Sequence, residues 1–355
     1  MKKSRYLRQM QLKEFGPEAQ QKLREASVVV IGAGGLGIPV LQYLNAMGVG
    51  TLGIVEQDIV EQSNLHRQVV FNEDDLGLPK IRVTADALAK QNTDTRIVLH
   101  DTFLVKNNAL EIINDYDVVV DASDNFPTRY LVNDACVILK KPFVYGALHG
   151  FEGQVSVFNL NGGPTYRCVF PQMPSASEIP NCDEHGVLGV LPGIVGSFQA
   201  LETVKVITGI GKVLSGKLML YNGLDNSILK IDIPTVTENL KIDELASDYQ
   251  PLSCDPTLEI KPEVLNSLMN GKGPLQLVDV RSVEEFHTFH LVGSKNIPLE
   301  QLSLSIDELD DGIPVYLLCQ SGTRSFRALH WLSENKPHFQ VFHLRGGIDA
   351  YKIHC

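Results

Sequence analysis

The ten residues VVVIGAGGLG, numbers 28–37, join a short apolar run to a glycine turn. Gly32, Gly34 and Gly37 have the G-x-G-x-x-G spacing, and a helix-like apolar pattern follows them. Glycines permit a tight turn and close approach of the backbone, and the N-terminus of the next helix offers free N–H groups to a phosphate. Glu56 ends the next predicted strand, TLGIVE, where an acid can bind ribose hydroxyls. The stretch therefore predicts a strand–turn–helix unit that binds a nucleotide.

The same alternation of apolar strands and helices continues on both sides of this unit. A helix is expected over 80–91, with strands at 96–100 and 117–123, which predicts an α/β fold with a mostly parallel, Rossmann-like sheet. Residues 236–258 are polar and acidic without a sustained period, and they predict a linker. A second alternation then predicts a small α/β domain. We expect one domain over 1–235 and another over 259–355.

Composition narrows the class of protein. With 355 residues, of which 44% are hydrophobic, the chain can bury two separate cores. No run reaches the roughly 18 apolar residues that span a bilayer, and the N-terminus lacks the apolar core of a signal peptide. The net charge of −11 disfavours nucleic acid as a partner. Six dispersed cysteines indicate free thiols in a reducing compartment, so we expect a cytoplasmic protein without membrane or nucleic-acid partners.

Charged and amide residues that follow the glycine turn differ from those of a dehydrogenase. Arginine and lysine neutralise phosphoryl charge, and a carboxylate holds a hard metal ion. Two cations with an acid therefore suit a triphosphate with magnesium better than a dinucleotide. Taken singly, each residue is more typical of a solvated surface than of a binding site. The candidates are Asn64, Arg67, Lys80, Asp121, Asp124 and Asn125.

Five motifs in order resemble the MoeB/ThiF (HesA) family of ubiquitin-activating-like adenylyltransferases, over about residues 4–233. They are RYLRQ, GAGGLG, QDIVEQSNLHRQ, GLPK and DASDN. The resemblance implies ATP and magnesium as cofactors. It also implies a partner protein of the ubiquitin fold, a sulfur carrier whose C-terminal glycine is adenylated.

The same resemblance implies roles for individual residues. Gly35 approaches the nucleotide, and Glu56 binds the ribose in place of the family's usual aspartate. Arg8 reaches into the site of a partner subunit, which implies a homodimer. Asp124 coordinates magnesium, beside Asn125. The phosphates are lined by Ser63, Asn64, Leu65, His66, Arg67 and Lys80.

Cysteines outside the predicted nucleotide site raise two further expectations. Cys182 matches a family cysteine that can be linked to the carrier. Most relatives hold a structural zinc with two C-x-x-C pairs, but here the first pair reads TYRC and the second is absent. Cys168 and Cys254 supply two ligands at most of the four that a tetrahedral site needs, so we expect no structural zinc. His66, His149 and His185 lack a partner at ligand or catalytic spacing.

The second domain contains LLCQSGTRSF, in which Cys319 ends an apolar strand and a loop leads into a helix. Backbone N–H groups of such a loop, the helix N-terminus and the cation of Arg324 would all favour a reactive thiolate. The loop is one residue shorter than that of a tyrosine phosphatase. With LVDVRSVEEF upstream and LRGGIDAY downstream, residues 259–355 resemble a rhodanese domain, which carries sulfur as a persulfide on the loop cysteine. Asp279, Arg281 and Glu285 are expected to be scaffold residues.

Together the two resemblances predict an adenylyltransferase and sulfurtransferase. The carrier would be adenylated, the Cys319 persulfide would attack, and a second thiol such as Cys182 would release a thiocarboxylate. The sulfur donor would be thiosulfate or a desulfurase persulfide. Two alternatives stay open. One is adenylation alone, with the rhodanese domain as a sulfur sensor or docking module, and the other is a non-catalytic nucleotide-binding regulator. The sequence leaves open whether the pathway is molybdopterin, thiamine or a related one.

Overall fold

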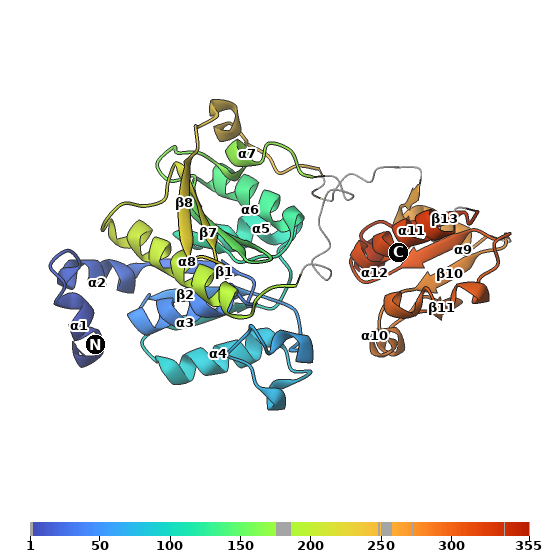
Figure 1. The fold of residues 1–355 in the computed structure, drawn as a ribbon, viewed down its shortest axis with the longest axis horizontal. Coiled ribbons are helices and arrows are strands. Elements are labelled where there is room, and N and C mark those ends of the chain that lie inside the picture. Colours follow the sequence, from blue (N-terminus) through green and yellow to red (C-terminus); the bar gives the residue numbers. More distant parts are fainter. Residues whose placement is uncertain are drawn as a thin grey trace. The chain divides into compact units, whose positions relative to one another are not determined.

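A computed structural model describes residues 3–174, 186–247, 249, 258–271, 273–336 and 338–354. The chain forms two compact units, Met1–Pro251 and Leu252–Cys355. Each unit has its own sheet and its own cores, so each is described by itself (Figure 1).

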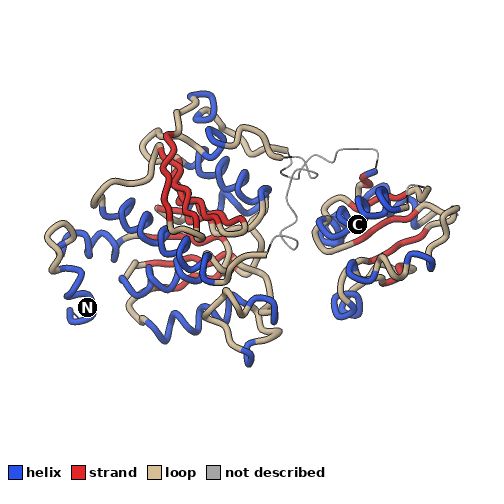
Figure 2. Tube along the Cα trace, in the orientation of Figure 1, coloured by secondary structure: helices blue, strands red, loops and turns tan. Residues whose placement is uncertain are grey.

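The first unit is built on an eight-stranded sheet in the order β3-β2-β1-β4-β5-β6-β7-β8. The first five strands in that order run parallel, and β6, β7 and β8 continue the sheet antiparallel. Figure 2 shows the strands in red and the helices in blue. The predicted mostly parallel, Rossmann-like sheet is therefore confirmed. The strands are β1 (Ser27–Ile31), β2 (Thr51–Val55), β3 (Arg96–His100), β4 (Val118–Asp121), β5 (Phe143–His149), β6 (Glu152–Phe158), β7 (Lys217–Asn222) and β8 (Ser227–Asp232).

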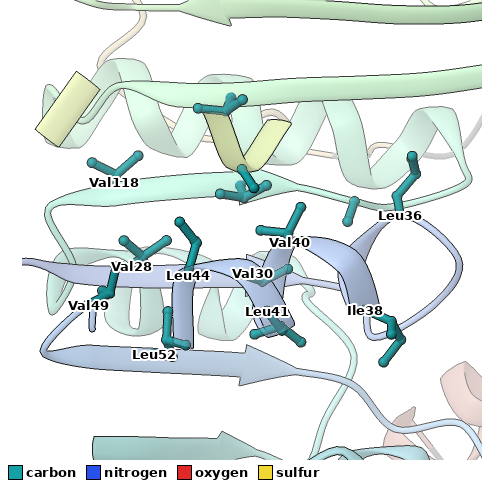
Figure 3. Packing of buried hydrophobic residues seen from close by; sticks show 14 of the residues in the cluster. Val28, Val30, Leu36, Ile38, Val40, Leu41, Leu44, Val49, Leu52 and Val118 are labelled. Carbon is teal, nitrogen blue, oxygen red and sulfur yellow. The ribbon is translucent and has the colours of Figure 1, made fainter. Parts of the chain in front are cut away.

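Helices cover both faces of this sheet and bury a core on each. One core lies under α2, α3, α4 and α8, and the other lies under α5 and α6. Figure 3 shows Leu41 and Leu44 of α3 packed beside Val28 and Val30 of β1. The helices are α1 (Lys3–Met10), α2 (Gly16–Glu25), α3 (Gly37–Met47), α4 (Lys80–Gln91), α5 (Lys106–Asn114), α6 (Phe126–Leu139), α7 (Tyr166–Val169) and α8 (Val190–Thr208).

Helix α8 is long and apolar enough to span a membrane by length and composition alone. Half of its most apolar window is buried inside the unit, where it packs on α3, β5 and β6. Gln199 and Glu202 are buried within it and donate to or accept from backbone groups of the same unit. These contacts are typical of the core helix of a globular domain.

The structure differs from expectation in the first half of the predicted linker, residues 236–258. Residues 237–240 form a short 3-10 helix, and Tyr249 is 8% exposed and packs in the core beneath α5 and α6. Polar composition predicted a linker here, but one aromatic side chain with a buried partner is enough to hold the segment on the first unit.

The second unit has a five-stranded, all-parallel sheet in the order β11-β10-β12-β13-β9. Helix α11 covers one face, and α9 and α12 lie against the other. The predicted small α/β domain is confirmed. Its elements are β9 (Glu259–Ile260), α9 (Pro262–Met269), β10 (Gln276–Asp279), α10 (Val283–Thr288), β11 (Ser294–Asn296), β12 (Val315–Leu318), α11 (Thr323–Asn335), β13 (Val341–Leu344) and α12 (Gly347–His354).

Candidate functional site

The glycine turn connects β1 to α3 at the carboxyl end of the parallel strands. Gly32 has a φ of 98°, in the region that favours glycine, and its N–H donates to the Val55 carbonyl at 2.9 Å. A Cβ on Gly37 would stand 1.9 Å from the Gly32 carbonyl oxygen. Both glycines are thus required by the turn itself, which places the N-terminus of α3 at this edge of the sheet.

Gly35 brings three distant segments together. A Cβ on it would lie 2.9 Å from Pro192 Cβ and 3.7 Å from Arg67 Cδ. A Cβ on Gly189, just before α8, would lie 2.3 Å from the His66 carbonyl oxygen. The turn, the segment 63–67 and the start of α8 therefore converge. The role of Gly189 and Pro192 was missed because nothing local in the sequence links them to a turn more than 150 residues earlier.

Within segment 63–67 some side chains anchor the chain and others face outward. Asn64 is 6% exposed, and Leu65 packs against the core. Ser63 and His66 are exposed, and Arg67 donates from Nη1 to the Ser63 carbonyl at 2.8 Å. The structure therefore groups the five predicted phosphate-site residues beside the glycine turn, with Arg67 as their cation.

Glu56 lies at the end of β2, where the sequence predicted a ribose-binding acid. Its carboxylate accepts from the backbone N–H groups of Ala33, Gln57 and Asp58 at 2.8–2.9 Å. These bonds tie the carboxylate to the glycine turn and fix its position. Among the residues that the structure describes, Oε2 accepts from Ala33 alone, so it retains a lone pair for a hydroxyl donor.

Lys80 begins α4 and is almost fully buried along its stem. Its side chain is 7% exposed, and Nζ lies 3.3 Å from Oδ2 of Asp58, which is 55% exposed. The Lys80 N–H also donates to the Asp58 carbonyl at 2.9 Å. A buried stem with one weak, solvated partner leaves the ammonium able to bind an added anion.

Asp121 and Asp124, which the sequence did not distinguish, differ in their burial. Asp121 is fully buried, its Oδ1 accepts from Ser123, and burial raises its pKa. Asp124 and Asn125 are exposed, and Asn125 caps α6 by accepting from the Thr128 N–H at 2.9 Å. Asp124 is therefore the accessible carboxylate. Arg129, which was not predicted, is buried and donates to the Ser123 carbonyl at 3.3 Å, so it supports this loop.

Magnesium suits this arrangement as a companion of a bound phosphate. Mg²⁺ keeps several waters and takes one or two carboxylates together with phosphate oxygens, so Asp124 alone can serve. Among the described residues no group of three or more His, Cys, Asp or Glu side chains could form an all-protein cage.

Arg8 is not brought to the site of its own chain. It is exposed on α1, which is fixed by Arg5 to the Gln91 carbonyl and by Gln9 to the Met47 carbonyl, at 2.9 and 3.1 Å. Met47 and Gln91 end α3 and α4, whose first residues lie at the site. At 1.5 Å per residue these helices are more than about 15 Å long, so α1 is attached far from the glycine turn.

The cysteines of the first unit have different surroundings. Cys182 and Cys254 lie outside the described residues, as does His185, while His149 lies at the exposed end of β5.

The Cys168 sulfur accepts from the N–H groups of Thr165 and Val236 at 3.3 and 3.4 Å, and from Asn239 Nδ2 at 3.5 Å. Burial raises the pKa of Cys168, but these hydrogen bonds outweigh it and hold the pKa below its ordinary value.

In the second unit, Cys319 follows β12 and is 1% exposed. Its sulfur accepts from the Gly322 N–H at 3.1 Å and contacts Ser325 Oγ at 3.4 Å. Gly322 has a φ of 94°, which turns its N–H toward the sulfur and opens α11. The predicted loop thus surrounds the thiol, with the Gly322 N–H and the Ser325 hydroxyl among its contacts.

Arg324, whose cation the sequence predicted would favour a thiolate at Cys319, pairs with an acid in the structure. It makes two hydrogen bonds of 2.6 Å with the carboxylate of Glu285. Arg281 likewise pairs with Asp279 and donates to Gln320 of the loop at 2.8 Å. The expected scaffold residues therefore orient the loop, and Glu285 in particular holds the guanidinium of Arg324.

Comparison with known proteins finds a family match for each of the two units. Residues 6–241 match the model of the ThiF family, and residues 261–354 match that of the rhodanese-like domain. Adenylyltransferase and sulfurtransferase MOCS3-2 of Zea mays is 38% identical over 98% of this chain and 78% of its own. The MOCS3 protein of Culex quinquefasciatus is 40% identical over 93% of this chain and 82% of its own.

Two further matches concern the first unit. A sulfur carrier protein adenylyltransferase of Thermus thermophilus is 55% identical over 64% of this chain and 86% of its own. The crystal structure of E. coli MccB with MccA-N7isoASN has a TM-score of 0.59 and 23% identity over 66% of this chain and 73% of its own, which shows a shared fold. The chain therefore belongs to the ThiF family, carries a C-terminal rhodanese-like domain, and is an adenylyltransferase and sulfurtransferase.

Proposed function

We propose that this chain adenylates the C-terminal glycine of a ubiquitin-fold sulfur carrier ending in Gly-Gly and then converts it to a thiocarboxylate. One observation supports the proposal: a single chain holds a glycine turn with Arg67 beside it and Lys80 at the start of α4, and a looped thiol at Cys319. The first centre suits formation of an acyl adenylate, and the second suits delivery of sulfur to it. Relatives with both domains are named for both activities.

In the first step a carboxylate oxygen of the carrier attacks the α-phosphorus of ATP, and pyrophosphate leaves. This step needs positioning and charge stabilisation rather than a protein nucleophile. Gly35 gives the nucleotide room, Glu56 accepts from a ribose hydroxyl, and Arg67 and Lys80 neutralise phosphoryl charge. Asp124 would hold magnesium, which offsets phosphate charge when it is bound.

Arg8 completes the site from a second subunit in this proposal. Its helix is attached at the ends of α3 and α4 remote from the glycine turn, and Arg8 itself is exposed. A homodimer in which each Arg8 serves the partner accounts for an exposed arginine on a rigidly held helix. Mixing Arg8→Ala chains with Lys80→Met chains would then restore part of the activity that each variant lacks.

The second step forms and breaks bonds in a defined order. The terminal sulfur of the Cys319 persulfide attacks the acyl carbon, AMP leaves, and an acyl disulfide links the carrier to Cys319. A second thiolate, assigned to Cys182, attacks the Cys319 sulfur and expels the thiocarboxylate. The disulfide left between the two cysteines is reduced by an external thiol, in keeping with a cytoplasmic location.

Mass spectrometry of candidate carriers tests the whole proposal. The protein is incubated with ATP, magnesium, thiosulfate and each host protein that ends in Gly-Gly, and exchange of oxygen for sulfur at the terminal carboxylate is expected on one of them. Adenylation without sulfur incorporation would favour the alternative in which the rhodanese domain is a sensor or docking module. Absence of ATP–pyrophosphate exchange with every carrier would favour the non-catalytic regulator.

A further inference from the structure

Arg129, in the first turn of α6, is a buried cation that the proposed reaction steps leave without a role. It is 8% exposed, and its guanidinium carbon lies 5.4 Å from the ring centroid of Phe126 and 5.7 Å from that of Tyr145. Arginine remains charged at working pH, and the two rings offset part of the cost of burying that charge. Among the residues that the structure describes, Nε has no hydrogen-bond partner. A buried cation with so few polar partners requires an explanation beyond packing.

The hydrogen bond that the guanidinium does make is directed at the loop between β4 and α6. Nη2 donates to the Ser123 carbonyl at 3.3 Å, and Ser123 immediately precedes Asp124. The N–H and the hydroxyl of Ser123 donate to Asp121 Oδ1 at 3.0 and 2.6 Å. The Asp121 carbonyl in turn accepts from Gln199 Nε2 of α8 at 2.7 Å. The backbone before Asp124 is therefore held by α6, by β4 and by α8.

The backbone after Asp124 is held by the same arginine. The Arg129 N–H donates to the Asn125 carbonyl at 3.4 Å, and Asn125 Oδ1 accepts from the Thr128 N–H at 2.9 Å. Asp124 lies between these two fixed neighbours and is itself exposed. The side chain of Arg129 thus binds the residue before Asp124, and its main chain binds the residue after it.

We propose that Arg129 is a positioning residue for adenylation, because it fixes the backbone on both sides of Asp124 and so holds that carboxylate in place for magnesium. The proposal rests on the function proposed above, in which Asp124 holds the metal. In it Arg129 contacts no reactant and acts through Asp124. Mg²⁺ keeps several of its waters and takes one or two carboxylates, so the placement of a single carboxylate has a large effect on how tightly the metal binds. Groups that orient a metal ligand typically contribute about 10- to 100-fold to metal affinity or activity.

Metal binding can be measured without turnover. The full-length protein is saturated with a non-hydrolysable ATP analogue, and Mn²⁺ replaces Mg²⁺ as a probe detected by electron paramagnetic resonance. Arg129→Met removes the cation and the bond to Ser123 but keeps most of the apolar stem. We expect this variant to bind Mn²⁺ about 10- to 100-fold more weakly than wild type. Arg24→Met, which removes an exposed cation from α2, is the matched control and should bind Mn²⁺ as wild type does.

Three further measurements separate positioning from a general loss of structure. Affinity for the analogue in EDTA depends on Gly35, Arg67 and Lys80 in this proposal, and it should be unchanged in Arg129→Met. In ATP–pyrophosphate exchange, the Mg²⁺ concentration that gives half the maximal rate should rise by the same factor as the Mn²⁺ dissociation constant. The rate at saturating Mg²⁺ should stay within a few-fold of wild type. Amide hydrogen exchange at Ser123 should be faster, because the loop that buries its N–H is held less firmly.

The outcomes judge this proposal and the proposed function separately. An unchanged Mn²⁺ affinity in Arg129→Met, an equal loss of analogue affinity in EDTA, or unchanged amide exchange at Ser123 would overturn the role of Arg129. If Arg129→Met does not fold, Arg129→Lys takes its place. Lysine lacks the planar fork that lies against two rings, so a smaller shift in the same direction is expected, and no shift would overturn the proposal. Wild type that binds the metal with the analogue but shows no ATP–pyrophosphate exchange with any carrier would instead refute the proposed function.

Discussion

Replacement of Lys80 by methionine should abolish adenylation while leaving the fold and the second activity intact. The Lys80 stem is buried, so methionine keeps most of the packing volume. Within the described part of the chain its ammonium pairs with the half-exposed Asp58 alone, at 3.3 Å, and loss of such an ion pair costs at most about 1 kcal/mol because water can solvate the remaining carboxylate. Loss of one preorganised charge contact to a transition state costs about 10²- to 10³-fold in rate. The expected kinetic loss is thus much larger than the stability loss.

The assay has an internal control in the same chain. ATP–pyrophosphate exchange with a saturating carrier reports the first unit, and transfer of sulfur from thiosulfate to cyanide reports Cys319. We expect Lys80→Met to lower exchange about 10²- to 10³-fold with unchanged cyanide activity. Lys90→Met, an exposed change on the same helix, should change neither. If exchange by Lys80→Met stays within a few-fold of wild type, the buried ammonium does not act on phosphate and the reasoning fails.

Three further outcomes follow from the site geometry. Cys319→Ala should lose cyanide and thiocarboxylate activity yet keep ATP–pyrophosphate exchange, and retention of full thiocarboxylation with thiosulfate would refute a persulfide on this residue. Elemental analysis of purified protein should find no stoichiometric zinc, since the Cys168 sulfur is occupied by backbone and amide donors; one zinc per chain would contradict this. Burial raises the pKa of Glu285, but its hydrogen bonds with Arg324 and the Ser282 N–H outweigh this and lower the pKa overall. The ionised carboxylate therefore stabilises the folded second unit fully above the ordinary pKa of 4.5. This stabilisation is lost as the pH falls through the lowered pKa. Urea unfolding of the second unit should therefore show a deficit for Glu285→Gln at pH 7 that shrinks at acid pH, and an equal deficit at both would argue against the ion pair.

Much of the fold and part of the site were predictable because their signals are local. The turn at Gly32 and Gly37 needs glycine for reasons internal to the strand–turn–helix unit, and apolar periodicity marks the strands on either side. The Cys319 loop is likewise a continuous stretch whose length and flanking elements decide its shape. Such features can be predicted from a single sequence because the residues that determine them are neighbours in the chain.

Residues that pair across long stretches of chain could not be placed in this way. Arg324 and Glu285 are 39 residues apart, and only the folded sheet shows that the guanidinium turns to the carboxylate and not to the thiol. Asp121 and Asp124 share one short motif, yet one is fully buried and the other exposed, because β4 ends between them. Burial therefore distinguishes a structural acid from an accessible one where composition cannot.

In the segment before the second unit, one buried side chain holds residues that composition assigns to a linker. Residues 236–249 are polar enough to predict a linker, and averaged composition gives no reason to expect them on a core. One tyrosine changes this, since burial of its ring recovers apolar area while its hydroxyl finds the buried carboxylate of Asp134. Because Asp134 also accepts from Arg167, the same carboxylate holds α7 and the segment around Tyr249 on α6.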